Sequence, residues 1–141
     1  MFGGSWLKGS LIKARKNSMS FSKDFYDFLN ENTLVEIKGG TQRDRFLQIW
    51  MVEVDGRVFA RSWNKSEQSW FTAFQKEGVG QIKFGESVID VTGKKLSSGS
   101  ELTDLINAAY LSKYTQEENL IYAQGITQPE YEAYTMEFKA I

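Results

Sequence analysis

Hydrophobic and polar residues follow two different periods along the chain, which predict helices and strands in turn. Near the beginning, hydrophobic residues recur every three to four positions, which predicts an amphipathic helix over residues 22–31 with Ser22 as its N-cap. A second helix is predicted to begin after the cap Ser66 and to end at Gly78. The residues that this second helix would bury are Trp70, Phe71 and Phe74.

Between and after these helices, hydrophobic residues alternate with polar ones, as they do in half-buried strands. The predicted strands cover residues 33–38, 46–54, 57–62, 80–84 and 87–92. Asp55-Gly56 separates the second of these strands from the third. Because an Asp-Gly pair between two alternating runs is the strongest short-range hairpin signal, we predict a central hairpin there. A second hairpin is predicted around Gly85-Glu86.

The later part of the chain is predicted to be helical until its last few residues. Ser98-x-x-Glu101 has the form of a capping box, and hydrophobic residues follow it at helical spacing. Thr115-x-x-Glu118 begins a further helical segment, and Pro129 opens one more short turn. Residues 136–140 alternate again and predict a closing strand.

The order of these elements predicts an α+β protein that is mainly β. Six mostly antiparallel strands would form a small, partly open barrel with helices packed outside it. Because the last strand has to pair with an earlier one, residues of about 98–133 form a helical insertion before it. We expect residues 21–141 to form one domain and residues 1–20 to form a basic leader segment.

Composition narrows the chemistry that is open to this chain. It has no cysteine and no histidine, which excludes disulfides, thiolate nucleophiles, imidazole acid–base catalysis and nearly every zinc or copper site. We therefore expect no metal site, and no catalytic residue stands out. The absence of cysteine fits a cytoplasmic protein. The aromatic share of 14%, with four Trp, suits a core and also a site that stacks on a planar ligand.

Charge is distributed unevenly along the chain. The net charge is −1, yet residues 1–23 hold five basic and no acidic side chains, which leaves 12 basic and 18 acidic residues in 24–141. This acidic body argues against a nucleic-acid-binding surface. The N-terminal segment lacks the apolar core of a signal peptide and no run is long enough to span a membrane, so we expect no stable membrane insertion.

The most informative short segment is Arg61-Ser62-Trp63, which follows the central hairpin, with Trp70 seven residues later. A guanidinium and a hydroxyl can hold a phosphate, and an indole can cover a flat ring. In an alternative interpretation, Arg61 is structural and pairs with a carboxylate such as Glu67 or Asp44. Trp70 would then belong to the hydrophobic core.

Several segments together resemble a known superfamily. They are Ile49-Trp50-Met51-Val52, Asp55-Gly56, Phe59-Ala60-Arg61-Ser62, Ser69-Trp70-Phe71, Ala108-Ala109-Tyr110-x-x-Lys113-Tyr114 and Thr135-Met136-Glu137-Phe138. Their order and spacing, over about residues 33–141, resemble the FMN-binding split barrels, which include pyridoxamine-phosphate-oxidase-like and deazaflavin-dependent nitroreductase-like proteins. More closely, the chain resembles an uncharacterised bacterial branch of that superfamily.

The resemblance implies a split β-barrel with a cofactor site. In cofactor-binding relatives the loop between the first two strands holds the flavin phosphate, and here Thr41, Arg43 and Arg45 would do so. The Ser-Gly pair and following Pro of the relatives are missing from this loop, and Asp44 would repel a dianion. In the alternative interpretation, the two loop arginines are solvated turn charges.

The same resemblance places a second contact with the cofactor after the central hairpin. Arg61, Ser62 and Trp63 match this contact, and Trp70 lies on the helix that faces it. Split-barrel relatives also commonly form dimers. The resemblance therefore implies a homodimer, with the region of Trp50 and Trp63 near its interface.

Tyr110, Lys113 and Tyr114 share one face of the first helix of the predicted insertion. A lysine beside a tyrosine can lower the pKa of the phenol and support acid–base chemistry. Alternatively, the two tyrosines pack the insertion onto the barrel while Lys113 extends toward solvent.

Two functional hypotheses follow. The first is a flavin- or deazaflavin-binding oxidoreductase, in which FMN or a deazaflavin carries the hydride. The second is a module on the same barrel that uses no cofactor and binds another small molecule or a protein partner, because a fold alone does not fix function.

Overall fold

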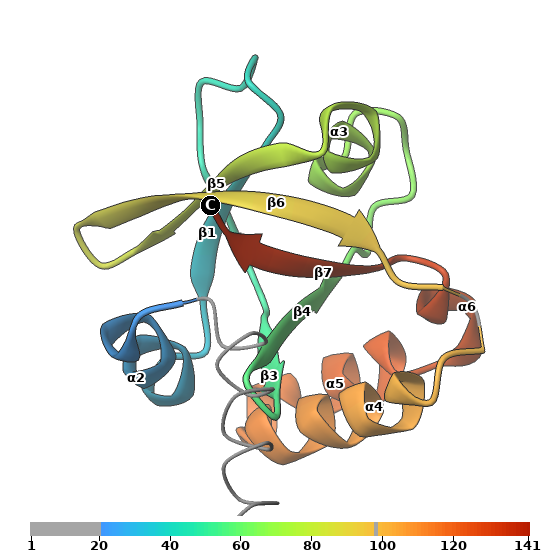
Figure 1. The fold of residues 1–141 in the computed structure, drawn as a ribbon. Helices are drawn as coiled ribbons and strands as arrows, with labels where there is room; N and C mark the ends of the chain where they lie inside the picture. Colours follow the sequence, from blue (N-terminus) through green and yellow to red (C-terminus); the bar gives the residue numbers. More distant parts are fainter. Residues whose placement is uncertain (1–20, 98) are drawn as a thin grey trace, which may run out of the picture.

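The computed structural model describes residues 21–97 and 99–141 of the chain (Figure 1). The strands are β1 (Val35–Gly39), β2 (Leu47–Ile49), β3 (Val52–Val54), β4 (Arg57–Arg61), β5 (Val79–Phe84), β6 (Ser87–Lys95) and β7 (Thr135–Ala140). The helices are α2 (Lys23–Glu31), α3 (Trp70–Glu77), α4 (Leu102–Lys113), the 3-10 helix η1 (Glu117–Asn119), α5 (Leu120–Ile126) and α6 (Pro129–Glu132). The predicted basic leader and Ser98, the first residue of the predicted capping box, lie outside the described residues. Glu101 of that capping box is the N-cap of α4 rather than a residue of its first turn.

The strands form one antiparallel sheet in the order β2-β1-β5-β6-β7-β4-β3. Although β2 and β3 lie at opposite edges of this order, only Trp50 and Met51 separate them along the chain. Three consecutive peptide units span at most about 11 Å, so the sheet has to curl until its two edges approach each other. The result is a half-barrel flanked by helices, which confirms the predicted fold class.

The number of strands differs from the prediction, because the single strand expected over 46–54 is two strands with different partners. Ile49 of β2 lies opposite Val35 of β1, whereas Val52 of β3 lies opposite Phe59 of β4. Between them, the Met51 N–H donates to the hydroxyl of Tyr114 at 3.1 Å, and the Met51 carbonyl accepts from Lys113 at 2.7 Å. In the described part of the chain, seven strands therefore replace the six that were predicted.

Two of the predicted helix caps can be compared with the structure. The Ser22 hydroxyl accepts from the N–H of Phe25, as the predicted cap requires, and the rings of Phe21 and Tyr26 meet edge to face at 6.0 Å beside it. The cap predicted for the second helix was wrong, because the residue whose hydroxyl accepts from a first-turn N–H is Ser69 and not Ser66. This later start places Trp70 at the first position of α3.

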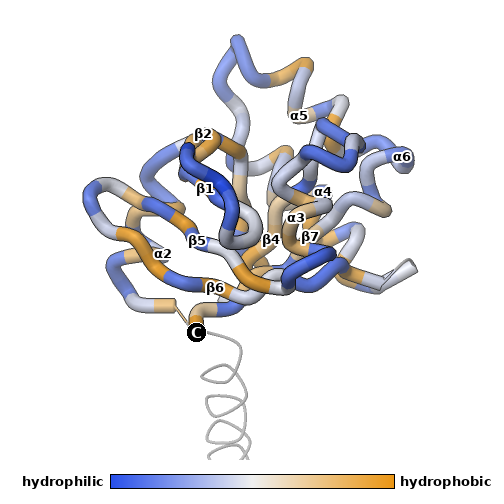
Figure 2. Tube along the Cα trace, turned by 90° about the horizontal axis from the view of Figure 1, so that it is seen from above, coloured by the Kyte–Doolittle hydropathy of each residue, from blue (hydrophilic) through white to orange (hydrophobic). Residues whose placement is uncertain are grey.

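The side chains form two hydrophobic cores that share strand β4. Val58 and Ala60 belong to the core that fills the half-barrel against α2 and α3, whereas Phe59 between them belongs to a second core against α4 and α5. Neighbouring residues of a strand point to opposite faces, so β4 is buried on both sides. Figure 2 shows hydrophobic and hydrophilic segments alternating along the chain, with α4, α5 and α6 on the side opposite β1 and β2. Within the described ranges, no helix is long and apolar enough to cross a membrane.

Candidate functional site

A cavity of about 270 Å³ lies where the two edges of the curled sheet approach each other. Its walls include the indoles of Trp50, Trp63 and Trp70, together with Arg61 and Ser62. These residues come from the β2–β3 connection, the end of β4 and the beginning of α3. The curl of the sheet therefore brings together four residues that the sequence predicted as a site, namely Arg61, Ser62, Trp63 and Trp70.

Arg61 is the most unusual residue of this cavity, because it is 3% exposed and has neutral partners. Its guanidinium donates to the hydroxyl of Thr135, to the side-chain oxygen of Asn107 and to the carbonyl of Ile126. Ile126 is the last residue of α5, where helix carbonyls carry a partial negative charge. Neither Glu67 nor Asp44 pairs with it, so the carboxylate partner expected from the sequence is wrong for the described residues.

One nitrogen of the Arg61 guanidinium has no partner. Its Nη2 is buried and makes no hydrogen bond within the described part of the chain. Burial lowers the pKa of Arg61 from its ordinary value, because removal from water disfavours the charged form. An anionic group that reached Nη2 would supply both the missing charge and the missing acceptor, and charge-assisted hydrogen bonds are the strong ones.

The indoles of the cavity are held in different ways. Trp63 is 45% exposed, and its ring meets Tyr131 edge to face at 4.9 Å. It rests on Gly125 of α5, where an added methyl group would come within 3.0 Å of the indole. Trp70 is 6% exposed and packs against Phe74 and Phe138, so most of its surface belongs to the core.

Trp50 and Ser62, which also line the cavity, are each held by a contact with a neighbouring residue. The Trp50 indole stacks on Tyr114 with ring centroids 3.8 Å apart and planes 8° from parallel. The Ser62 hydroxyl donates to the carbonyl of Asn64 at 2.7 Å. In this arrangement Ser62 holds the turn after β4.

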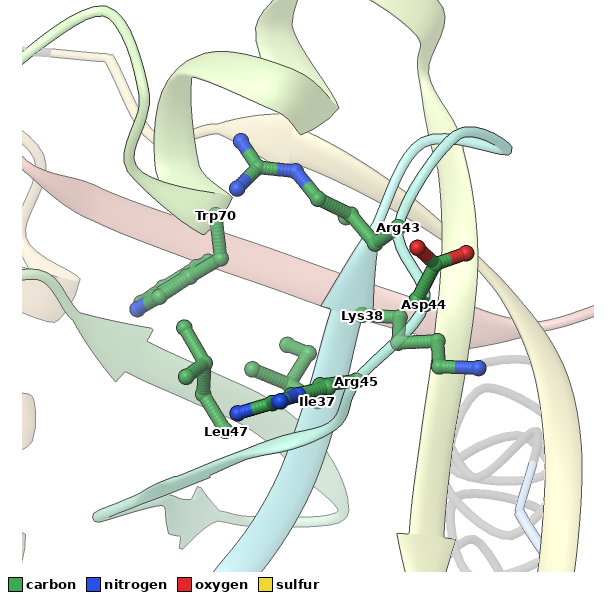
Figure 3. Close-up of a pocket in the computed structure, with 8 residues that line it drawn as sticks. Ile37, Lys38, Arg43, Asp44, Arg45, Leu47 and Trp70 are labelled. Atoms are coloured by element: carbon green, nitrogen blue, oxygen red, sulfur yellow. The ribbon is translucent and has the colours of Figure 1, made fainter.

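A neighbouring cavity of about 280 Å³ is lined by Arg43 and Arg45 of the loop between β1 and β2 and by Trp70 of α3 (Figure 3). The Arg43 guanidinium donates to the carbonyl of Gln68 at 2.6 Å, just before α3, so it ties the loop to that helix. Arg45 is exposed and forms no ion pair with the described residues. Because Trp70 lines both cavities, it lies between the two groups of predicted site residues.

Thr41 lines neither of these two cavities. Its hydroxyl donates to the carboxylate of Glu77 at 2.8 Å, and its backbone N–H points to the same carboxylate. With Arg43 it lines a third cavity, of about 480 Å³, which also includes Asp90. The structure therefore divides the seven predicted residues over three adjoining surfaces.

The two tyrosines of α4 pack as the structural interpretation predicts, whereas Lys113 does not extend toward solvent as that interpretation expected. Tyr110 is buried and its hydroxyl accepts from the N–H of Arg61 at 2.8 Å, while the Tyr114 hydroxyl donates to Thr33 at 2.6 Å. Burial raises the pKa of Tyr110 to about 12 and raises that of Tyr114 further. The pKa of both phenols therefore shifts upward, opposite to the lowering expected beside an activating lysine. The Lys113 ammonium binds the Met51 carbonyl rather than extending freely into water.

Sequence reasoning missed the residues that fix Arg61 in place. Asn107, Ile126 and Thr135 lie 46 to 74 positions further along the chain, beyond the reach of any local motif. Of these three residues, Thr135 was noted in the sequence as part of the segment Thr135-Met136-Glu137-Phe138, but not as a partner of Arg61. Nothing in the sequence indicated that the Trp50 indole stacks on Tyr114, a residue 64 positions away.

Comparisons with known proteins support the same fold. One similar crystal structure is that of HutZ, the heme storage protein from Vibrio cholerae, whose sequence is 13% identical to this one. The two structures superpose with a TM-score of 0.56, over 86% of this chain and 89% of the HutZ chain. The conserved hypothetical protein Rv2991 from Mycobacterium tuberculosis is 12% identical with a TM-score of 0.54, over 88% of this chain and 81% of that one. Identities this low establish a shared fold alone. Among curated proteins, none matches the sequence.

Membership of a family rests on the sequence itself. A family model described as an uncharacterised protein conserved in bacteria, DUF2255, matches residues 31–138. The match covers most of the chain and includes the cavity residues from Leu34 to Ile126. The chain therefore belongs to the DUF2255 family of bacterial proteins, as the resemblance to an uncharacterised bacterial branch led us to expect.

Proposed function

We propose that this protein binds a flavin or deazaflavin cofactor in the half-barrel, as the FMN-binding split barrels do, and acts as an oxidoreductase. The observation that carries this proposal is the buried Arg61, which lines a cavity walled by indoles and whose Nη2 forms no hydrogen bond with the described residues. A buried guanidinium without a counter-charge is costly, and an anionic ligand would offset that cost. Indole faces are suited to cover a planar ring.

The two cavities that share Trp70 would bind different parts of the cofactor, the ring in one and the phosphate in the other. Trp63 and Trp50 would flank the ring, and Arg61 would hold its anionic edge. Arg45 and Arg43 would hold the phosphate in the neighbouring cavity. Thr41 would join them only after its hydroxyl exchanged Glu77 for the phosphate. When bound, such a cofactor supplies hydride transfer, while the protein supplies orientation and exclusion of water.

HutZ suggests a porphyrin as another planar ligand for this fold, since it is described as a heme storage protein. Two observations favour the smaller flavin ring. The cavity of about 270 Å³ lies slightly below the usual range of ligand sites, which begins at about 300 Å³. The chain also has no histidine or cysteine, which are the commonest axial ligands of haem iron.

A small-molecule-binding module without a cofactor is the second candidate. It is favoured by the loop between β1 and β2, where Thr41 is bonded to Glu77 and Arg43 to Gln68. In this alternative, the loop is a structural clamp on α3. Arg61 and the indoles would then bind a smaller anion that has no phosphate tail.

We further propose a cytoplasmic homodimer whose interface lies near Trp63. The exposed half of this indole adjoins exposed apolar side chains of α5, including Tyr122 at 6.5 Å from it. Light scattering coupled to size exclusion would test the dimer. A mass of 16.1 kDa at all concentrations would contradict it.

The test is a titration of the full chain with FMN, with a deazaflavin cofactor and with hemin, followed by tryptophan fluorescence. We expect FMN or the deazaflavin to quench the fluorescence at micromolar concentrations. Arg61→Met should weaken this binding roughly 10-fold to 100-fold, because a hydrogen bond to a charged group contributes about 1.5–3 kcal/mol.

Arg57→Met is the matched control, because Arg57 also lies on β4 and pairs with β7, through Glu137 at 2.7 Å. It should alter stability and leave the affinity within about twofold, because Arg57 lines neither cavity of the proposed site and distant sites contribute independently. Absence of quenching by either flavin would reject the cofactor proposal. Equal losses in the two variants would show that the effect comes from the fold rather than from Arg61.

A further inference from the structure

A separate cavity of about 370 Å³ lies between α4, β3 and α2, on the side of β3 that faces the insertion. Its lining includes Lys113 and Ser112 of α4, Glu53 of β3 and Asn30 of α2. None of these residues belongs to the indole cavity described above. The proposed cofactor function makes no use of this second cavity.

Lys113 lines this cavity without a carboxylate partner. Its Nζ donates to the carbonyl of Met51 at 2.7 Å and lies 5.2 Å from the centre of the Tyr114 ring. Glu53 is the charged group that shares the cavity, but its carboxylate accepts from the N–H of Gly56 and from Asn30. Within the described residues, no acid lies at ion-pair distance from Lys113.

These surroundings favour the neutral amine. Burial lowers the pKa of Lys113 to about 8, because the ammonium is removed from water without a counter-charge. At pH 7.5 an amine with that pKa is roughly one-quarter unprotonated, whereas an ordinary lysine is about 0.1% unprotonated. Only the unprotonated form has the lone pair that attacks a carbonyl carbon.

We propose that Lys113 is a reactive amine that forms an imine with a small, uncharged aldehyde in this cavity. The Nζ lone pair attacks the carbonyl carbon, and the carbonyl π electrons move to oxygen, which takes up a proton. Nζ releases a proton to water, the hydroxyl group takes up a second proton and leaves as water, and the nitrogen lone pair forms the C=N bond. The resulting protonated imine is in equilibrium with the neutral imine by loss of its N–H proton to water. No oxidant or reductant is consumed. The carboxylate of Glu53 disfavours anionic aldehydes, which is why an uncharged one is expected.

The test uses propanal with the full chain at pH 7.5. Cyanoborohydride traps the imine as a stable propyl-lysine, and peptide mass spectrometry after short incubation times gives a rate for each lysine. We expect Lys113 to react at least about 10-fold faster than the exposed Lys76 and Lys139, because its neutral fraction is larger. The rate at Lys113 should level off above a pH of about 8 to 9.

Three comparisons make the result decisive. In urea, where the cavity is lost, the advantage of Lys113 should disappear. Lys113→Arg should remove the fast-reacting site and leave the rates at Lys76 and Lys139 unchanged. If Lys113 in the folded chain reacted no faster than these exposed lysines, its role would be limited to binding the Met51 carbonyl and the proposal would be overturned.

Discussion

Gly93→Ala is the substitution for which the structure gives the sharpest prediction of stability. Phe74 of α3 packs against glycines on three neighbouring strands, namely Gly39 of β1, Gly80 of β5 and Gly93 of β6. The three atoms that a methyl group at Gly93 would meet first all belong to the Phe74 ring, with two of them at 2.9 and 3.0 Å. Carbon atoms prefer a separation of about 3.5–4.0 Å, so the ring has to move.

The expected loss follows from two opposing contributions. Overpacking of a core costs about 1–3 kcal/mol, while replacing glycine lowers the entropy of the unfolded chain and recovers about 0.4–1 kcal/mol. We therefore expect Gly93→Ala to lower the free energy of unfolding by about 1–2 kcal/mol. Because Phe74 and Trp70 lie on the same helix, the substitution should also disturb the wall of the indole cavity.

A double-mutant cycle with Phe74→Leu tests the cause. Leucine lacks the part of the ring that the new methyl group would meet, so the two changes together should cost less than the sum of each alone by about 1 kcal/mol. Urea unfolding followed by tryptophan fluorescence measures all four free energies. Additive losses would refute the contact between Gly93 and Phe74 as the origin of the effect.

Three further predictions concern the seam of the half-barrel and its neighbours. Tyr114→Phe should lower the free energy of unfolding, measured with urea, by about 2–4 kcal/mol, because the buried Met51 N–H and the Thr33 carbonyl lose their hydrogen-bond partner. A loss below about 0.5 kcal/mol would contradict this. The pKa of Lys113 is about 8 when folded and 10.5 when unfolded, so between these values the unfolded chain binds more protons and the unfolding free energy rises with pH. Unfolding at pH 7.5, 8.5 and 9.5 should show this rise in wild type relative to Lys113→Met, and parallel curves would exclude it. Gly125→Ala should displace the Trp63 indole and weaken FMN binding without a large loss of stability, which titration and urea unfolding together would check.

Features that depend on neighbouring residues could be predicted from the sequence. The Asp55-Gly56 turn has positive φ values of 51° and 84°, as the hairpin signal required, and Ser22 caps its helix. The strand break at Trp50-Met51 could not be predicted, because residues 49–52 are all hydrophobic and give no local sign that the partner strand changes. The groups that satisfy Met51 come from Lys113 and Tyr114, more than 60 positions away.

In the candidate site too, residues adjacent in sequence could be predicted, whereas contacts between distant residues could not. The segment Arg61-Ser62-Trp63 pointed to the indole cavity because its residues are adjacent in sequence. The neutral partners of Arg61 come from three separate elements, so the sequence favoured a carboxylate in their place. Likewise, the bond between Thr41 and Glu77 joins residues 36 positions apart and could not be read from the loop alone.

The most direct test of the proposed function is to locate the bound ligand on the protein. Two-dimensional ¹H–¹⁵N NMR spectra recorded during titration with FMN would follow the indole N–H groups, assigned by single Trp→Phe variants. We predict that the resonances of Trp50, Trp63 and Trp70, together with the Nε–H of Arg61, shift in one saturable step. Shifts confined to the surface around Gly80 and Asp90, or no shifts at all, would contradict the placement of the cofactor in the indole cavity.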